Sequence, residues 1–298
     1  MNRLTVFTPT YNRAYIINRL IDSLLNQTVF SFSWLVIDDG SSDNTEELFA
    51  AFQKKKIPFD FRYLKTKNGG KQRAINWAVS MIDTEYTFIV DSDDYLVPDA
   101  IEKVLNWINN KEIDNHFAGV SGVKGIDINT PVGNKKLLFA EDYVDATNLE
   151  RKKYGLELDM AEVYKTDILR KHPFEVYENE TFVPEATVWD LIALEGYKLR
   201  WHRDIIYICE YLEDGLTNKS WELLKNNPVG YAKLFNLQLI TNEKRKRKTC
   251  IQMVCSLILA HRWDLIFKSN APVMALLCTP AAFVLSLKRK EQFKKYVK

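Results

Sequence analysis

The sequence predicts an α/β fold: a mostly parallel central sheet with helices on both faces, followed by a helical C-terminal tail. Short apolar runs alternate with segments of helical periodicity through residues 1–125. Polar clusters follow four of these runs, and beyond residue 216 apolar and basic helical segments replace the alternation. With 298 residues, 46% apolar and 27% charged, the chain is long and apolar enough for a large core, which excludes a disordered protein.

Strands and helices are expected in strict alternation over the first 125 residues. The expected strands are 3–9, 32–40, 59–66, 86–94 and 116–125. The expected helices are 14–27, 42–55, 70–82 and 98–111. The helical pattern is clear in AYIINRLIDSLLNQ, where Ile16, Leu20 and Leu24 recur at helical spacing. Strands joined by such helices run parallel.

The rest of the body is less regular. A helix is expected from Glu185 to Leu194, ended by Gly196, and one or two strands over 198–212. We therefore predict a body of residues 1–215, in two halves of 1–125 and 126–215, and a separate helical region of 216–298.

Charge is unevenly distributed along the chain. Residues 244–298 hold 13 Lys+Arg and 2 Asp+Glu, a net +11, whereas the remaining 243 residues carry 28 against 37, a net −9. The tail is therefore expected to face an anionic membrane surface. Its 17-residue uncharged run, 271–287, contains two prolines, which favours a segment in the membrane interface or a re-entrant hairpin over a full span. Packing on the body or in a dimer is the alternative.

Other composition features restrict the setting. The acidic body, without aromatic residues interleaved among basic ones, argues against nucleic-acid binding. The four cysteines form no C-x-x-C pair, which indicates reduced thiols in the cytoplasm. MNRLTVFTPTY enters a strand at once, so neither a signal peptide nor an N-terminal anchor is expected.

The four polar clusters follow four predicted strands. They are TPTY (8–11), DDG (38–40), NGGK (68–71) and DSDD (91–94). Because ligands bind outside the carboxyl ends of parallel strands, these clusters are expected to converge on one site.

Carboxylates dominate two of the clusters. Asp91, Asp93 and Asp94 after a buried strand repel one another unless a cation compensates them, and hard oxygens suit Mg²⁺ or Mn²⁺. Asp39 is suited to accept the N3–H of a uracil ring. The alternatives are a solvated loop or a helix cap for the first group and a simple turn for Asp39.

The third cluster supplies positive charge. Gly69 and Gly70 permit close approach of the backbone, and Lys71 and Arg73 stand at a helix N-terminus, which suits a diphosphate. A turn with solvated basic residues is the alternative, since the full phosphate-loop spacing is missing.

Together, FTPTYNR, VIDDGSSDNT, KNGGKQRAIN and FIVDSDD resemble family 2 glycosyltransferases with the GT-A fold over roughly residues 1–215. Residues 178–217 resemble the acceptor half of the bacterial capsule and surface-polysaccharide branch. The resemblance implies inverting transfer from a nucleotide sugar, usually UDP-linked, to a saccharide or polyprenyl-lipid-linked acceptor. It also implies a cytoplasmic enzyme, peripheral at the inner face of the membrane through 244–298.

The resemblance implies the site residues by position. The residues implied to bind the nucleotide sugar are Thr8, Pro9, Tyr11, Arg13, Asp39, Asn68, Gly70, Lys71, Asp91 and Ser92. Asp93, with Asp91, would ligate Mn²⁺ or Mg²⁺.

Two departures from the family pattern bear on catalysis. Ile75 stands where many members have Arg, so Lys71 or Arg73 must supply the anion contact. Ala186 stands where many members have the catalytic Asp. Glu185 is then our choice of base and Asp190 the weaker one, although Glu185 also fits a helix-capping role. The alternative functions are an impaired nucleotide-sugar-binding protein and a nucleotidyltransferase, which would usually have a Gly-rich loop after the first strand.

Overall fold

The structure, a computed structural model, describes residues 2–133, 136–210, 212, 215 and 219–297. The chain forms two compact units. Unit 1 comprises Met1–Pro173 and Ile192–Glu210, and unit 2 comprises Phe174–Leu191 and Tyr211–Lys298. Residue 216, where the tail was predicted to begin, lies outside the described residues.

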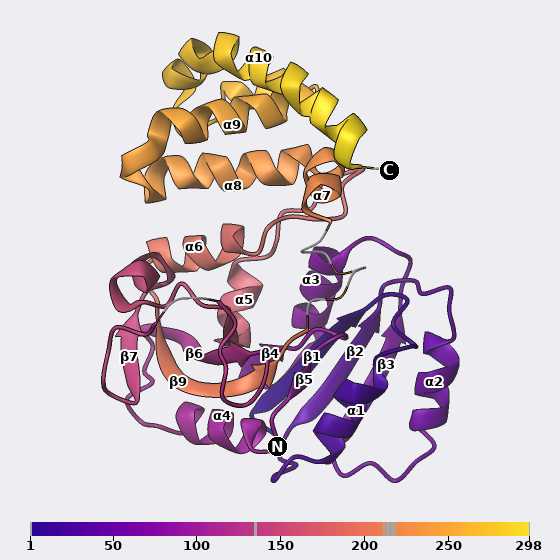
Figure 1. Ribbon diagram of the computed structural model, residues 1–298. Coiled ribbons are helices and arrows are strands. Elements are labelled where there is room, and N and C mark those ends of the chain that lie inside the picture. Colours follow the sequence, from indigo (N-terminus) through magenta and orange to yellow (C-terminus); the bar gives the residue numbers. More distant parts are fainter. Residues whose placement is uncertain (1, 134–135, 211, 213–214, 216–218, 298) are drawn as a thin grey trace. The chain divides into compact units, whose positions relative to one another are not determined.

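The described residues of unit 1 build one nine-stranded sheet (Figure 1). Its strands are β1 (Leu4–Thr10), β2 (Ser33–Asp38), β3 (Asp60–Lys65), β4 (Tyr86–Ile89), β5 (Tyr95–Leu96), β6 (Phe117–Gly125), β7 (Tyr143–Ala146), β8 (Met160–Lys165) and β9 (Lys198–Ile208). The order is β3-β2-β1-β4-β8-β6-β9-β5, with β7 beside β9. Strands β1 to β4 are parallel and β9 is parallel to β6, whereas β8 lies antiparallel between β4 and β6. The predicted α/β class is confirmed.

Helices cover both faces of this sheet. Those of unit 1 are α1 (Asn18–Leu25), α2 (Thr45–Phe52), α3 (Lys71–Met81), α4 (Ala100–Ile108) and α5 (Thr166–Lys171), with the 3₁₀ helix η1 (Asn148–Tyr154). Apolar residues of α1, α2 and α4 share one core with β1 and β2, while α3 and α5 pack side by side on the other face (Figure 1).

One aromatic cluster fixes the first two strands. The Trp34 ring, fully buried on β2, packs edge-on against Phe49 and Phe52 of α2. Its Nε1 donates a 3.0 Å hydrogen bond to Thr8 Oγ1 on β1. This bond satisfies the indole N–H inside the core and links the start of β2 to the C-terminal half of β1.

Unit 2 is helical. Its helices are α6 (Ala186–Leu194, which continues into unit 1), α7 (Ser220–Asn226), α8 (Pro228–Thr241), α9 (Lys246–Leu259) and α10 (Pro272–Tyr296), with the 3₁₀ helices η2 (Glu243–Arg245) and η3 (Trp263–Ile266). Helix α9 lies between α8 and α10 (Figure 1). All four cysteines are buried and free of disulfides.

Hydrogen bonds explain why the 174–191 segment belongs to unit 2. The buried Glu180 carboxylate accepts the Val229 and Gly230 N–H groups at 2.7 and 2.8 Å, which caps the start of α8. The Asn227 side-chain oxygen accepts the N–H groups of Thr181 and Phe182 at 2.8 and 2.9 Å. Because buried backbone donors need partners, these bonds tie the segment to α8.

Candidate active site

The polar clusters after β1, β2 and β3 come together. Thr10 pairs with Asp38 in the β1–β2 register. The Asp39 N–H then donates to the Thr10 carbonyl at 2.8 Å, and the Thr66 N–H donates to the Asp38 carbonyl at 2.8 Å. The carboxyl ends of three parallel strands are thus joined by backbone bonds just beyond the sheet.

Asp39 organises the loop that precedes α3. Its carboxylate accepts the Gly69 and Gly70 N–H groups at 2.8 and 2.7 Å, and the Asn68 side-chain amide donates to the Asp39 carbonyl at 2.9 Å. Burial raises the pKa of Asp39, and the two glycine N–H groups partly offset that rise. Each carboxylate oxygen still has a second lone pair for a ligand donor.

The turn after β2 requires glycine. Gly40 has φ +80°, and a Cβ there would lie 2.7 Å from the Asn68 backbone nitrogen. Its neighbour Asp38 is fully buried and accepts the Ser41 N–H at 2.7 Å and the Tyr63 hydroxyl at 2.5 Å. Asp38 therefore holds the turn, and Asp39 holds the loop in front of α3.

Opposite charges meet at the end of β4. The Lys71 ammonium, on the first residue of α3, lies 2.6 Å from the Asp91 carboxylate, and the Arg13 guanidinium lies 3.8 Å from that of Asp93. Burial alone would raise the pKa of Asp91, but Lys71 and Lys124 lower it overall. Burial and the Asp91 charge raise the pKa of Asp93. The two carboxylates thus repel each other and are partly compensated by cations.

Two residues without a predicted site role, Tyr207 and Lys124, support this centre together with Asp94 of the predicted carboxylate cluster. The buried Tyr207 hydroxyl, on β9, accepts the Asp91 N–H at 3.0 Å and donates to Asp94 at 2.7 Å. Burial, with the Asp91 charge, raises the pKa of Asp94 to about 7. The Lys124 ammonium lies 4.2 Å from the centroid of the Tyr207 ring. In the sequence, Lys124 and Tyr207 differ from their neighbours only as polar groups within apolar strands, which does not predict a role at the site.

The other residues expected at the donor site occupy different environments. Thr8 is fully buried, and its hydroxyl accepts the hydrogen bond from the Trp34 indole N–H. Pro9 is buried as well, whereas Tyr11 is 47% exposed just beyond β1. Ser92 is buried between the two carboxylates of its motif.

The donor chemistry at Asp91 and Asp93 fits a hard divalent cation. Their repulsion is of the kind that such an ion relieves, and Mg²⁺ or Mn²⁺ commonly takes only one or two carboxylates while keeping positions for phosphate oxygens. Within the described residues, no group of three or more His, Cys, Asp or Glu side chains is arranged as a complete metal site.

The candidate bases lie in unit 2. Glu185 directly precedes α6, and its carbonyl accepts the N–H groups of Val188 and Trp189 at 2.9 and 3.2 Å. Asp190 is part of the same helix. Ala186 is the first residue of α6, so the helix begins without the carboxylate that many family members have there.

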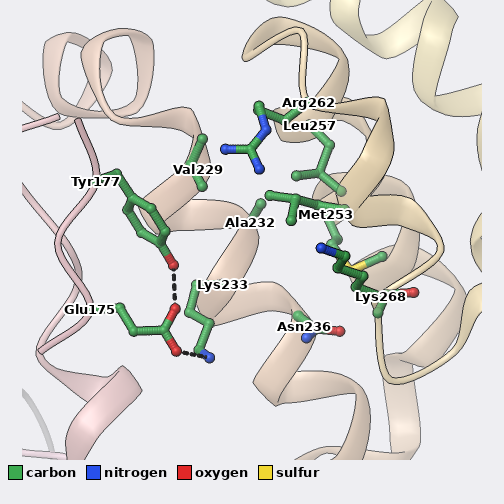
Figure 2. A pocket seen from close by; sticks show the side chains of 12 residues that line it. Glu175, Tyr177, Val229, Ala232, Lys233, Asn236, Met253, Leu257, Arg262 and Lys268 are labelled. Atoms are coloured by element: carbon green, nitrogen blue, oxygen red, sulfur yellow. Dashed lines mark hydrogen bonds and ion pairs between the residues drawn. The ribbon is translucent and has the colours of Figure 1, made fainter. Parts of the chain in front are cut away.

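Unit 2 also contains a cavity of about 180 Å³ between α8, α9 and η3 (Figure 2). Apolar side chains such as Val229 and Leu257 line it together with polar ones. Glu175 accepts from the Tyr177 hydroxyl and from Lys233, and Arg262 is paired with Asp264 at 2.8 Å. Three of the four charged side chains that line the cavity, Glu175, Lys233 and Arg262, thus have ion-pair partners within the protein, and the fourth is Lys268.

The fold and the strand-end site define a GT-A-type glycosyltransferase domain. Residues 5–152 match the family model described as glycosyl transferase family 2. The chain belongs to this family.

A curated relative agrees with this assignment, and solved structures agree with the fold. The chain is 30% identical over 206 residues to the poly(ribitol-phosphate) beta-N-acetylglucosaminyltransferase TarP of Staphylococcus aureus. This alignment covers 67% of this chain and 61% of TarP. The structure of S. aureus TarS 1–349 in complex with UDP-GlcNAc aligns over 99% of this chain and 92% of that one, with 16% identity and a TM-score of 0.59. The mannosyltransferase PcManGT of Pyrobaculum calidifontis, in complex with GDP-Man and Mn²⁺, aligns over 98% and 83%, with 18% identity and a TM-score of 0.58.

Proposed function

We propose that the chain transfers a sugar from a uridine-linked nucleotide sugar to a saccharide or lipid-linked saccharide acceptor, with inversion of configuration. The observation that carries the proposal is the meeting of a cation and two carboxylates at the carboxyl edge of the sheet, where Lys71 lies 2.6 Å from Asp91. The names of the relatives, which include UDP-GlcNAc in the TarS complex, support a UDP-linked donor.

Donor binding is assigned to residues of unit 1. Asp39 and Asn68 offer an acceptor and a donor for the edge of a uracil ring, and the half-exposed Tyr11 ring offers a face for stacking. Lys71 stands at the N-terminus of the 11-residue α3, where its charge and the helix dipole both favour a diphosphate. Asp91 and Asp93 would hold Mn²⁺ or Mg²⁺, which when bound supplies positive charge beside that diphosphate.

Glu185 is proposed as the general base. It would take the proton from an acceptor hydroxyl, whose oxygen then bonds to the anomeric carbon from the face opposite the departing diphosphate, so configuration inverts. Lys71 offsets the negative charge that develops on the nucleoside diphosphate. The Glu185→Gln variant should lose about 10²–10⁴-fold in kcat, and Asp190→Asn much less. Near-normal turnover of Glu185→Gln would remove it from this role.

The acceptor and the location form a second part of the proposal. Transfer onto poly(ribitol-phosphate) by the similar TarP supports an acceptor that belongs to a bacterial surface polymer. Such acceptors are commonly lipid-linked, so we propose that the chain works in the cytoplasm, peripheral at the inner face of the membrane through residues 244–298. The net charge of +11 on that segment supports this location.

The experiment is turnover of a panel of nucleotide sugars with Mn²⁺ or Mg²⁺, followed by proton NMR of the anomeric signals. Hydrolysis suffices as a readout of donor cleavage, because water replaces an unknown acceptor, and the anomeric signals are recorded before the released sugar mutarotates. Release of UDP with an inverted sugar, lost in Asp93→Ala and retained in Asp83→Asn, is the expected result. Asp83 is exposed and is the matched carboxylate control.

Ala186 favours one alternative, a nucleotide-sugar-binding protein without transfer activity. It predicts that UDP-sugars bind to the chain but are neither hydrolysed nor transferred. In that case Ala186→Asp should restore measurable turnover, whereas under the main proposal it changes an enzyme that is already active.

A further inference from the structure

Helix α10 has two apolar faces. The buried residues of α10 recur every three, four or seven positions and pack toward α9; they are Ala275, Cys278, Ala282, Ser286 and Phe293. At about 100° per residue, the exposed apolar residues fall on the opposite face. These residues, here called the outer stripe, are Val273, Leu276, Leu277, Phe283, Val284 and Leu287, and they are 48% to 78% exposed.

The outer stripe is unusual for a protein surface. Single exposed apolar side chains are common, but six on one helix face form a continuous patch of the kind that marks an interaction site. The neighbouring 3₁₀ helix η3 and the residue after it add aromatic side chains, since Trp263 and Phe267 are 45% and 66% exposed. Tryptophan and phenylalanine beside leucine-rich helix faces are typical of segments that lie in a membrane interface.

Basic residues continue the outer stripe. After Leu287, the same face carries Lys288, Lys294 and Lys295, all exposed, with Glu291 among them. The whole 244–298 segment has a net charge of +11. An apolar face that passes into a basic one complements a bilayer with anionic headgroups, whereas a second copy of the chain would bring a second large positive charge.

The geometry of α10 argues against a transmembrane span. By length and composition, α10 is the one helix of the described residues that is able to cross a bilayer. Its uncharged part, Pro272 to Leu287, is only about 24 Å long, against roughly 30 Å of hydrocarbon. Its inner face is moreover occupied by α9, where Arg289 donates to Gln252 at 3.3 Å. A helix with one face on protein and one face apolar and exposed fits a position parallel to the membrane.

We infer that α10 lies flat on an anionic bilayer, with the outer stripe among the acyl chains and Lys288, Lys294 and Lys295 among the headgroups. This inference specifies which surface of the chain contacts the membrane. It rests on the proposed function only for the identity of that membrane, the inner face of the cell membrane. Unit 2 would then act as the membrane anchor of the enzyme, while the inner face of α10 remains packed on α9.

The test is co-sedimentation of the full chain with vesicles of phosphatidylcholine alone or of phosphatidylcholine with about one-quarter phosphatidylglycerol. The wild type should bind the anionic vesicles much more strongly. Leu277→Glu, at the most exposed position of the outer stripe, should lower the partition coefficient about tenfold or more. Ile128→Glu, at a 67% exposed position of unit 1, should leave it unchanged. Each of Lys294→Gln and Lys295→Gln should weaken anionic binding by about fivefold at low salt.

Several outcomes would overturn the inference. One is equal binding by the wild type and Leu277→Glu when circular dichroism shows both folded; Val273→Glu serves as a second variant if Leu277→Glu misfolds. Resistance of vesicle-bound protein to alkaline carbonate would indicate a span. A dimer that Leu277→Glu converts to monomers, without vesicle binding by the wild type, would assign the outer stripe to a second copy. No donor or acceptor is present, so failure here leaves the proposed reaction untouched, and Asp93→Ala must bind vesicles as the wild type does.

Discussion

Replacing His202 with phenylalanine should flatten the dependence of stability on pH. The His202 imidazole, on β9, is 6% exposed and stacks on Trp107, with 4.0 Å between ring centroids. Burial, assisted by the charge of Arg200, lowers the pKa of His202 from 6.5 to about 3. Between these values the unfolded chain binds the proton and the folded chain does not, so stability is lost as the pH falls below 6.5.

The magnitude follows from the two pKa values. At about pH 5, which is roughly 1.5 units below the unfolded-state pKa, the cost is about 2 kcal/mol relative to pH 7.5. The His202→Phe variant keeps a ring against Trp107 but has nothing to protonate. Between about pH 7.5 and pH 5, the free energy of unfolding should therefore decrease in both proteins through their shared groups, but the decrease should be about 2 kcal/mol smaller in His202→Phe than in the wild type.

The assay is urea unfolding followed by tryptophan fluorescence at about pH 7.5, 6 and 5. Comparing wild type with variant cancels the other titrating groups, which are common to both. His116→Gln is the control, because that imidazole is 85% exposed, and it should keep the wild-type pH dependence. His202→Gln should behave like His202→Phe. Parallel pH profiles for wild type and both His202 variants would refute the reasoning.

Three further predictions concern the site and its support. Tyr207→Phe leaves the Asp91 N–H and the Asp94 carboxylate without their buried partner, so it should cost about 2–4 kcal/mol in urea unfolding and weaken UDP binding. Glu180→Gln places an amide NH₂ opposite one of the two backbone N–H groups at the start of α8, so one donor loses its acceptor. The free energy of unfolding of unit 2, followed by its helical signal in urea, should decrease by about 1–3 kcal/mol. Gly40→Ala should lower UDP affinity in calorimetry by displacing Asn68, whereas Gly196→Ala, with φ +87° but nothing within 4 Å of its Cβ, should be destabilised yet bind normally.

The parts of the fold that depend on local periodicity were predictable. Alternating apolar runs and helical repeats located β1 to β4 and the helices between them, because each element buries one face on the same sheet. The antiparallel β8 between β4 and β6 was not predicted, since strand order depends on pairing between residues far apart in the chain.

The candidate site shows the same division. The positions of Asp39, Lys71 and Asp91 at strand ends follow from the motifs themselves. The contributions of Lys124 and Tyr207 follow only from the pairing of β6 with β9, which places them opposite each other. The burial of Thr8 was also hidden, because its partner Trp34 lies on the neighbouring strand.

The two faces of α10 were likewise beyond the sequence. The run 271–287 is apolar on all sides, so its periodicity does not distinguish the side that packs on a neighbour from the side that remains exposed. The structure separates them because α9 covers one side, through residues such as Ala275 and Ala282.

The central claim is that the strand-end carboxylates and Lys71 form a donor site, and thermal unfolding with UDP and Mn²⁺ tests it most directly. A ligand that binds only the folded state adds about 2.7 kcal/mol of stability at one hundred times its Kd. We predict a UDP-dependent rise in Tm that requires Mn²⁺ and is lost in both Asp93→Ala and Lys71→Met but kept in Asp83→Asn. No rise with any nucleoside diphosphate, in wild-type protein that unfolds cooperatively, would contradict the account.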